Sequence, residues 1–224
     1  MKDSSENISH SFDINDASQE RRVHHAYETT LQLGRHAINF AAIERAPRYS
    51  EDRYENDAEH SFMLSLIAPE LAAQLLPHLD CALVTQFAIV HDLVELETGD
   101  TVTFALNESE LMQKETDEHE AMQRLLNRLP PHTGALLKRY EKQQEPEARF
   151  VRLADKLLPL VANIHGPGKQ VMGESFGIED PEQLRITELT CSQRLRNSFP
   201  ESELDIVHAV RDLLAQHFHT VFET

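Results

Sequence analysis

"FAIVHDLVELETGD" occupies residues 87–100, and this stretch decides how the chain is interpreted. Its apolar residues recur with the spacing of a helix that faces a hydrophobic core, yet His91, Asp92 and Glu95 interrupt them. Residues three or four positions apart share one face of a helix, so the three groups should gather at one place. Burying an unpaired charge costs several kcal/mol. The stretch therefore needs a compensating partner, either hydrogen bonds from neighbouring helices or a metal ion.

Two more polar side chains fall within apolar patterns elsewhere. Asp155, in "FVRLADKLLPLV", follows the core-facing spacing of its helix, and aspartate is rarely buried without a partner. Lys156 points about 100° away on a helix, so we expect the partner cation to come from another element. His60, in "NDAEHSFMLSLI", precedes an apolar run. Taken singly it is more often a core or surface residue than a ligand, because the chain has 13 histidines.

Together these residues supply two imidazoles and two carboxylates: His60, His91, Asp92 and Asp155. Mixed nitrogen and oxygen ligands suit one divalent transition metal ion, namely Mn, Co, Fe, Ni or Zn, with Mg as an alternative. A bound dication would also offset the buried negative charge. A structural zinc site is disfavoured because the two cysteines form no cluster.

The charge balance excludes several classes of partner. The chain carries 38 acidic and 21 basic residues, for a net charge of −17. Such a field repels phosphate backbones and anionic lipid, so we expect neither a nucleic-acid polymer nor a membrane as partner. Two cysteines without a CxxC pair suit a reducing compartment, and the N-terminus lacks the pattern of a signal peptide. We therefore expect a cytoplasmic protein.

Helical periodicity without strand alternation predicts an all-α fold. Residues 1–17 are expected to be a disordered tail, and residues 18–224 a single domain. The polar segment 45–56 is predicted to be a loop. The glycine-rich residues 166–178 are predicted to be a mobile loop, and they lack the full phosphate-binding P-loop pattern. Residues 179–224 are predicted to be a C-terminal helical extension.

Caps and breakers place the helix ends. Asn56 or Asp57 should begin one helix and Asp80 another, and Gly99 should end the helix that carries the opening stretch. The predicted helices cover residues 18–46, 57–76, 81–98, 108–129, 134–144, 146–165, 181–197 and 202–222.

The order of these motifs resembles a known family. "ENDAEHS", then "HDLVELETGD", then "RLADKL" resemble the H…HD…D pattern of the HD-domain metal-dependent phosphohydrolases, and most of all the bacterial 5′-deoxyribonucleotidase branch. The resemblance covers roughly residues 30–165. It implies an HD-domain helical bundle with additional C-terminal helices, one bound metal ion and a homodimer.

The resemblance also implies a role for each matching residue. The four histidine and aspartate residues named above would hold the metal. Glu95 would be the acid/base group beside the water that the metal activates. Arg45 would orient the phosphate, and Asp100 and Thr103 would contact the substrate. The family has Arg-Trp-Pro where this chain has Arg45-Ala46-Pro47, so an aromatic surface for the nucleoside is missing and the base preference stays open.

The leading hypothesis is therefore a metal-dependent phosphoric monoester hydrolase that removes the 5′ phosphate from (deoxy)nucleoside monophosphates. One alternative is a nucleoside triphosphate hydrolase on the same site, which would call for more basic residues than this acidic chain offers. Another is a non-catalytic module that senses metal or nucleotide, although Glu95 and Arg45 weigh against it. A third is a helical interaction protein that uses the acidic residues 108–129, a run that is more simply a solvated face.

Overall fold

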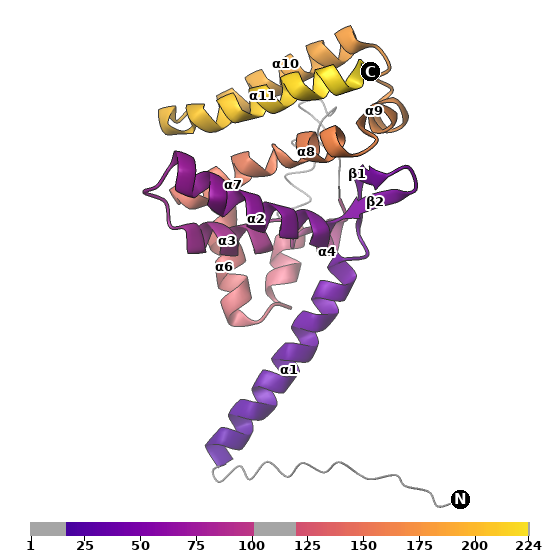
Figure 1. Cartoon of the computed structure of the whole chain (residues 1–224). Helices are drawn as coiled ribbons and strands as arrows, with labels where there is room; N and C mark the ends of the chain where they lie inside the picture. Colours follow the sequence, from indigo (N-terminus) through magenta and orange to yellow (C-terminus); the bar gives the residue numbers. More distant parts are fainter. Residues whose placement is uncertain (1–16, 101–119, 224) are drawn as a thin grey trace, which may run out of the picture.

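The computed structural model describes residues 17–100 and 120–223, which are mostly helical with one small hairpin (Figure 1). The predicted all-α fold class is confirmed. In chain order the elements are α1 (Ala17–Phe40), β1 (Glu44–Ser50), β2 (Arg53–Asn56), α2 (Asp57–Leu75), α3 (Cys81–Val90), α4 (Glu95–Thr98), a helical stretch at 120–126, α6 (Pro131–Glu141), α7 (Pro146–Asp155), α8 (Leu158–His165), α9 (Gly168–Phe176), α10 (Pro181–Ser198), η1 (Ser202–Leu204) and α11 (Asp205–Phe222).

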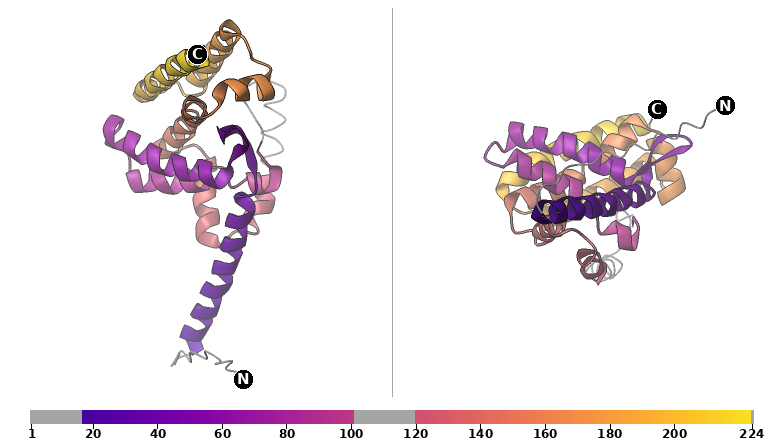
Figure 2. Two further views of the ribbon diagram at one scale, coloured as in Figure 1. Left: turned by 45° about the vertical axis from the view of Figure 1, so that its right-hand side comes forward. Right: turned by 90° about the horizontal axis from the view of Figure 1, so that it is seen from below.

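Two apolar clusters hold the helices together. In the first, α2, α3, α6 and α7 pack around fully buried side chains such as Leu64, Phe87 and Phe150. In the second, α8 and α9 pack against the α10–α11 pair through residues that include Val171 and Phe218. Figures 1 and 2 show α10 and α11 side by side above the first group, while α1 projects from the opposite end. No helix in the described ranges is both long and apolar enough to span a membrane.

Polar caps set the beginnings of the two helices that carry the opening motif residues. The side chain of Asn56 accepts the backbone N–H of Glu59, and Glu59 accepts the backbone N–H of Asn56 in return. Asp80 accepts the N–H groups of Ala82 and Leu83 at the start of α3. Both predicted caps are therefore confirmed.

The predicted loop at 45–56 is wrong, because these residues form the β1–β2 hairpin. Glu44 pairs with Asn56, and Arg48 pairs with Tyr54, with irregular register between them. The first helix, expected to reach residue 46, ends at Phe40. Pro47 disfavours helical backbone in the residue before it, and the Arg48 guanidinium stacks 4.3 Å from the centre of the Tyr54 ring. Cross-strand packing thus gives this polar segment a regular structure.

The predicted mobile loop at 166–178 is also wrong, because most of it is the helix α9. Val171 and Met172 are buried in the second apolar cluster, and that burial outweighs the low helix propensity of glycine. Gly177 has φ 65° and ends α9 in the left-handed conformation. Gly177 therefore marks the end of a helix, and the segment before it is not a loop.

Two predicted helices are interrupted where their polar residues lie. The regular helix α3 ends at Val90, and the chain continues through a turn at 91–94 into α4, which Gly99 ends with φ 72°. The predicted helix 146–165 breaks between α7 and α8. Pro159, in the first turn of α8, has no N–H and its ring clashes with the carbonyl four residues earlier. Both breaks lie at predicted metal ligands.

Candidate metal centre

The structure brings the four predicted metal ligands together from three elements. His60 lies on α2, His91 and Asp92 lie in the turn after α3, and Asp155 is the last residue of α7. One ligand atom from each residue lies within 4.8 Å of all the others. His60 Nε2 is 2.8 Å from Asp155 Oδ1, and His91 Nε2 is 3.0 Å from Asp92 Oδ2. These separations fit four groups arranged around a common centre.

The turn after α3 allows two consecutive residues to face the same centre. On a regular helix His91 and Asp92 would point about 100° apart. Here the N–H of Leu93 donates to Val90 O at 3.1 Å and that of Glu95 to Asp92 O at 2.9 Å, which are bonds of the tighter i to i+3 type. Such a turn still spaces consecutive residues about 120° apart, but His91 Nε2 and Asp92 Oδ2 lie 3.0 Å apart, so both side chains reach the same centre.

His91 is oriented through the ring nitrogen that faces away from the centre. Its Nδ1 lies 2.9 Å from the carbonyl oxygen of Ala88, so it donates its hydrogen there and leaves the Nε2 lone pair free. This is the usual way in which proteins fix a metal-binding imidazole. His60 Nδ1 faces Glu55 Oε1 at 3.5 Å, and both side chains are 1% exposed, but the two atoms do not form a hydrogen bond.

The buried atoms of the cluster fit a metal ion. His91 Nε2 is buried and has no hydrogen-bond partner within the described parts of the chain, which is costly for a polar atom. A divalent ion would accept that lone pair, and Asp92 and Asp155 would add carboxylate oxygens. Two imidazoles and two carboxylates are ligands that suit a borderline divalent metal.

Asp155 pairs with the adjacent residue, which was not expected, as well as with the two histidines from other elements. Lys156 Nζ lies 2.7 Å from Asp155 Oδ2, because α7 ends at Asp155 and the lysine side chain reaches back from the break. Burial alone would raise the pKa of Asp155, but Lys156, His60 and His91 hold it well below its usual range. The carboxylate is therefore ionised, and its Oδ1 faces the histidines.

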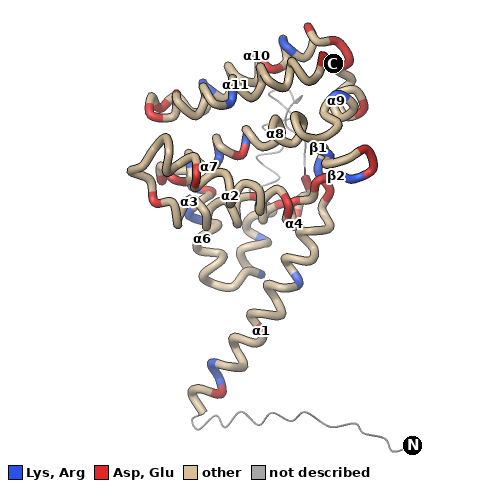
Figure 3. The backbone as a smooth tube through the Cα atoms, in the orientation of Figure 1, with Lys and Arg blue, Asp and Glu red and all other residues tan. Residues whose placement is uncertain are grey.

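Arg45 lies beside the cluster and contacts four carboxylates. Its side chain is 12% exposed. The distances from Nη1 are 2.8 Å to Asp57, 3.0 Å to Asp92, 3.2 Å to Glu95 and 3.5 Å to Asp100. Three of these carboxylates, Asp57, Glu95 and Asp100, form a second acidic group next to the histidine cluster. Figure 3 shows acidic residues concentrated where α4 meets the hairpin. Arg45 thus joins the two groups.

Crowding among like charges shifts the pKa values here. Burial and the charge of Asp92 raise the pKa of Glu95 to about 11, although Arg45 opposes the shift. Burial likewise raises the pKa of Asp57. Burial disfavours the charged form of His91, but Asp92 and Asp155 outweigh it and raise its pKa to about 10. Without a cation, the cluster therefore holds protons at neutral pH.

Two residues of the site were missed by sequence reasoning. Asp57 is fully buried and contacts Arg45, but an acidic residue in the first turn of a helix is ordinary. Glu55 contacts His60 and lies 3.7 Å from Arg45 Nε, and it accepts the Tyr49 hydroxyl at 3.1 Å. It lay in a segment predicted to be a loop, so nothing marked it as buried. The available signal was the alternation of the acidic residues Glu55, Asp57 and Glu59 immediately before His60.

The remaining predicted residues have different outcomes. Asp100 lies next to Arg45, as described above, whereas Thr103 falls outside the described residues. Arg53, in the same hairpin as Arg45, is mostly exposed and pairs with Glu59.

Comparison with known proteins places this arrangement in a family. A model of the HD domain matches residues 42–193, which is most of the described chain. The chain belongs to the HD domain family. This HD domain is similar to the crystal structure of a predicted metal-dependent phosphohydrolase from Magnetospirillum magnetotacticum MS-1, with 25% identity and a TM-score of 0.65 over 86% of this chain and 92% of that one.

A second solved structure shares the fold of this HD domain. The PH0347 protein from Pyrococcus horikoshii OT3 is 18% identical with a TM-score of 0.54, over 82% of this chain and 98% of that one. No functionally curated protein matches the chain. The comparisons therefore give the family and the fold, and the site residues carry the functional argument.

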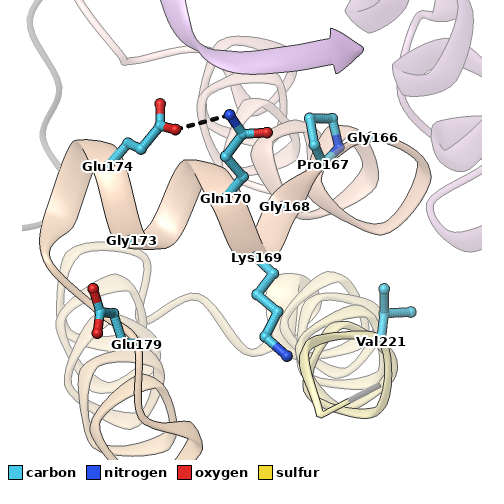
Figure 4. Close-up of a pocket in the computed structure, with 9 residues that line it drawn as sticks. All are labelled: Gly166, Pro167, Gly168, Lys169, Gln170, Gly173, Glu174, Glu179 and Val221. Carbon is cyan, nitrogen blue, oxygen red and sulfur yellow. Dashed lines mark hydrogen bonds between the residues drawn. The ribbon is translucent and has the colours of Figure 1, made fainter. Parts of the chain in front are cut away.

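A cavity of about 610 Å³ lies away from the metal cluster of this HD domain. Figure 4 shows it at the start of α9, lined by Pro167, Lys169, Gln170 and Glu174 among others. Gln170 donates to Glu174 at 2.8 Å, and Glu174 also accepts from Arg48 at 2.7 Å. The lining contains none of the metal-cluster residues, so this cavity is not the candidate metal centre.

Proposed function

We propose that this HD domain is a metal-dependent phosphohydrolase that removes the 5′ phosphate from nucleoside monophosphates, in particular deoxynucleotides. The observation that carries the proposal is one juxtaposition: an arginine and a high-pKa carboxylate lie against a cluster of two histidines and two aspartates. A purely structural ion would need neither Arg45 nor Glu95.

His60, His91, Asp92 and Asp155 would hold the ion. When bound, it supplies a Lewis acid that polarises a phosphoryl oxygen and lowers the pKa of a water molecule. The similarity to the predicted metal-dependent phosphohydrolase from Magnetospirillum magnetotacticum MS-1 supports metal-dependent chemistry at this site.

Arg45 binds the phosphate in this proposal. Its planar guanidinium offers several N–H donors and can bind two phosphate oxygens at once. Asp57, 2.8 Å from Nη1, fixes the guanidinium at the edge of the cluster. The negative charge that develops on the phosphoryl group during transfer is therefore met by a positioned cation.

Glu95 is the acid/base group in this proposal. It is 5% exposed, and Oε2 lies 3.2 Å from Arg45 Nη1, so it is beside the place where Arg45 would hold the phosphate. Proton transfer by such a positioned group contributes about 10²–10⁴-fold to a rate. Asp100, 3.5 Å from Arg45 Nη1, would bind the sugar, in line with the resemblance to the 5′-deoxyribonucleotidase branch.

The preference for monophosphates rests on charge. Among the described residues near the cluster, Arg45 and Lys156 are the cations with contacts to its carboxylates, and Lys156 is already paired with Asp155. A triphosphate adds further negative charges that need positive partners. A net charge of −17 provides no general attraction for them.

A panel of substrates tests this proposal. The chain is stripped of metal, loaded with Mn, Co, Fe, Ni, Zn or Mg, and assayed for inorganic phosphate released from ribo- and deoxynucleoside 5′-mono- and triphosphates. We expect fastest release from 5′-monophosphates with a transition metal and none after chelation. Pyrophosphate or triphosphate as the main product would replace the proposal with triphosphate hydrolysis. Metal binding without release from any nucleotide would favour a sensing module.

A further inference from the structure

Helix α1 has two apolar faces, and within residues 17–100 and 120–223 only one of them is covered. Its 24 residues project from the body as Figures 1 and 2 show. The covered face includes Leu33, His36 and Phe40, and Gln32 and His36 contact the carbonyl of Arg128. The opposite face carries a row of exposed apolar side chains, here called the outer stripe: Val23, Tyr27, Leu31 and Ile38.

The first half of α1 has little to stabilise it within one copy of the chain. Every residue from 17 to 28 is exposed. Isolated helices of about 12–15 residues are marginal in water even with strong helix formers, and this segment contains Val23 and Tyr27, which are weaker ones. A helix that extends this far gains stability if another surface covers its outer stripe.

Three residues of the outer stripe, taken together with Gly34, have the spacing of paired helices. Tyr27, Leu31, Gly34 and Ile38 are separated by four, three and four residues, which is the spacing of the seam between two helices of a coiled coil. Gly34 lies in the middle of this row, and a side chain added there would meet nothing within 4 Å in a single copy. Glycine in an exposed helix costs about 0.5–1 kcal/mol relative to alanine, and the described part of a single copy gives no reason for it.

We propose that two copies of this chain pair through the outer stripe of α1, with the two helices antiparallel. If the midpoint lies between residues 32 and 33, Tyr27 faces the partner's Ile38 and Leu31 faces the partner's Gly34. The large leucine then occupies the space that the glycine leaves. The same pairing brings Glu28 close to the partner's Arg35 along one flank of the seam. The surface is thus complementary to itself in both shape and charge.

The overall charge favours antiparallel over parallel pairing. Each copy carries a net charge of −17, and most of its mass lies at the C-terminal end of α1 (Figure 1). Parallel helices would place two acidic bodies side by side and set Gly34 against Gly34. An antiparallel pair of helices about 36 Å long places the bodies at opposite ends, which reduces their repulsion.

Sedimentation velocity of the full chain over about a hundredfold range of concentration tests this pairing, which does not depend on the proposed function. We expect a dimer that dissociates on dilution. Leu31→Glu should be monomeric at every concentration, with far-UV circular dichroism showing that the body stays folded. Leu213→Glu is the matched control, because Leu213 is a similarly exposed leucine on α11, 65% against 52%, and it should still dimerise.

Two further variants test the arrangement itself. Gly34→Gln should raise the helix content of α1 but weaken dimerisation about tenfold or more, whereas a merely structural glycine would not weaken it. Arg35→Glu should weaken the dimer, and adding Glu28→Arg should restore it. A wild-type chain that stays monomeric throughout, or a Leu31→Glu variant that still dimerises, would overturn the proposal.

Discussion

Two buried ionic groups in this protein are built on opposite principles. Between α10 and α11, Arg211 donates to Glu188 at 2.6 Å, and the two side chains are 5% and 7% exposed. One cation faces one anion there. Around Arg45, four carboxylates lie within 3.5 Å of a single guanidinium nitrogen. The first group is balanced within the fold, and the second is not.

The difference separates structural from functional use of buried charge. A balanced pair can hold two helices in register with nothing else bound. In an unbalanced cluster the carboxylates lack enough positive partners, and the excess negative charge raises the pKa values of Glu95 and His91. Both groups consist of buried acidic and basic side chains, but only the unbalanced cluster around Arg45 predicts a ligand.

The largest loss of activity should follow removal of the carboxylate assigned to proton transfer. Glu95→Gln keeps the shape of the side chain and the metal ligands but cannot exchange a proton. We expect metal content to be unchanged and turnover to fall about 10²–10⁴-fold, measured by phosphate release and metal analysis of the same sample. Glu188→Gln serves as the control and should leave turnover per folded molecule unaffected. Equal turnover of Glu95→Gln and wild type would remove the assigned role.

Arg45→Lys tests whether the cluster needs a guanidinium or only a positive charge. Lysine keeps the positive charge but loses the planar fork that binds two oxygens, so we expect kcat to fall about 10²–10³-fold. Arg53→Lys, in the same hairpin but exposed, should change little. Steady-state kinetics with the best monophosphate measures both, and a Lys variant with normal kcat would show that charge alone is sufficient.

The two groups should respond to loss of a carboxylate with opposite signs. Glu188→Gln leaves the buried Arg211 without its partner and should cost about 3–5 kcal/mol of stability, whereas Glu182→Gln, in an exposed pair on the same helix, should cost less than about 1 kcal/mol.

In the metal-free protein Glu95→Gln should raise Tm. Since the folded pKa of Glu95 lies above its unfolded value, the wild type loses stability as pH rises from about 4.5 toward 11, and glutamine does not. Thermal unfolding at several pH values measures all three variants, and a lower Tm for Glu95→Gln would contradict the account of the cluster.

Metal affinity should depend on pH through His91. In the metal-free fold its pKa is raised to about 10, so its contribution to stability is complete below about pH 6.5 and is lost as pH rises toward 10. A metal needs the deprotonated ring. We therefore expect affinity to rise about tenfold per pH unit across this range, with about one proton released by this residue. Calorimetry in buffers of different ionisation enthalpy measures that release, and pH-independent affinity would contradict it.

Local chemistry made some features of this chain predictable. Asn56, Asp80 and Gly99 act at helix ends through their own side chains or backbone freedom, so single residues sufficed to place those boundaries. The four candidate ligands lie in motifs whose order identified the family before any packing was known. Roles such as acid/base transfer at Glu95 depend on a bound substrate, and these stay predictions.

Other features depended on distant contacts and could not be found locally. The glycines of α9 suggested a loop, because the burial of Val171 and Met172 against α11 is invisible in the segment itself. Asp57 looked like an ordinary first-turn acid, and its importance arises from Arg45, which arrives from the hairpin. The Lys156–Asp155 pair required knowing that α7 ends there.

The position of Arg45 among the carboxylates imposes a sequence on ligand entry. Under the proposed function, a nucleotide that arrives first competes with Asp57 and Asp92 for the same guanidinium nitrogen. A metal ion that arrives first binds Asp92 and weakens that competition. We therefore expect an ordered path, cation before anion, in which enzyme preincubated with nucleotide alone shows a lag that preincubation with metal abolishes.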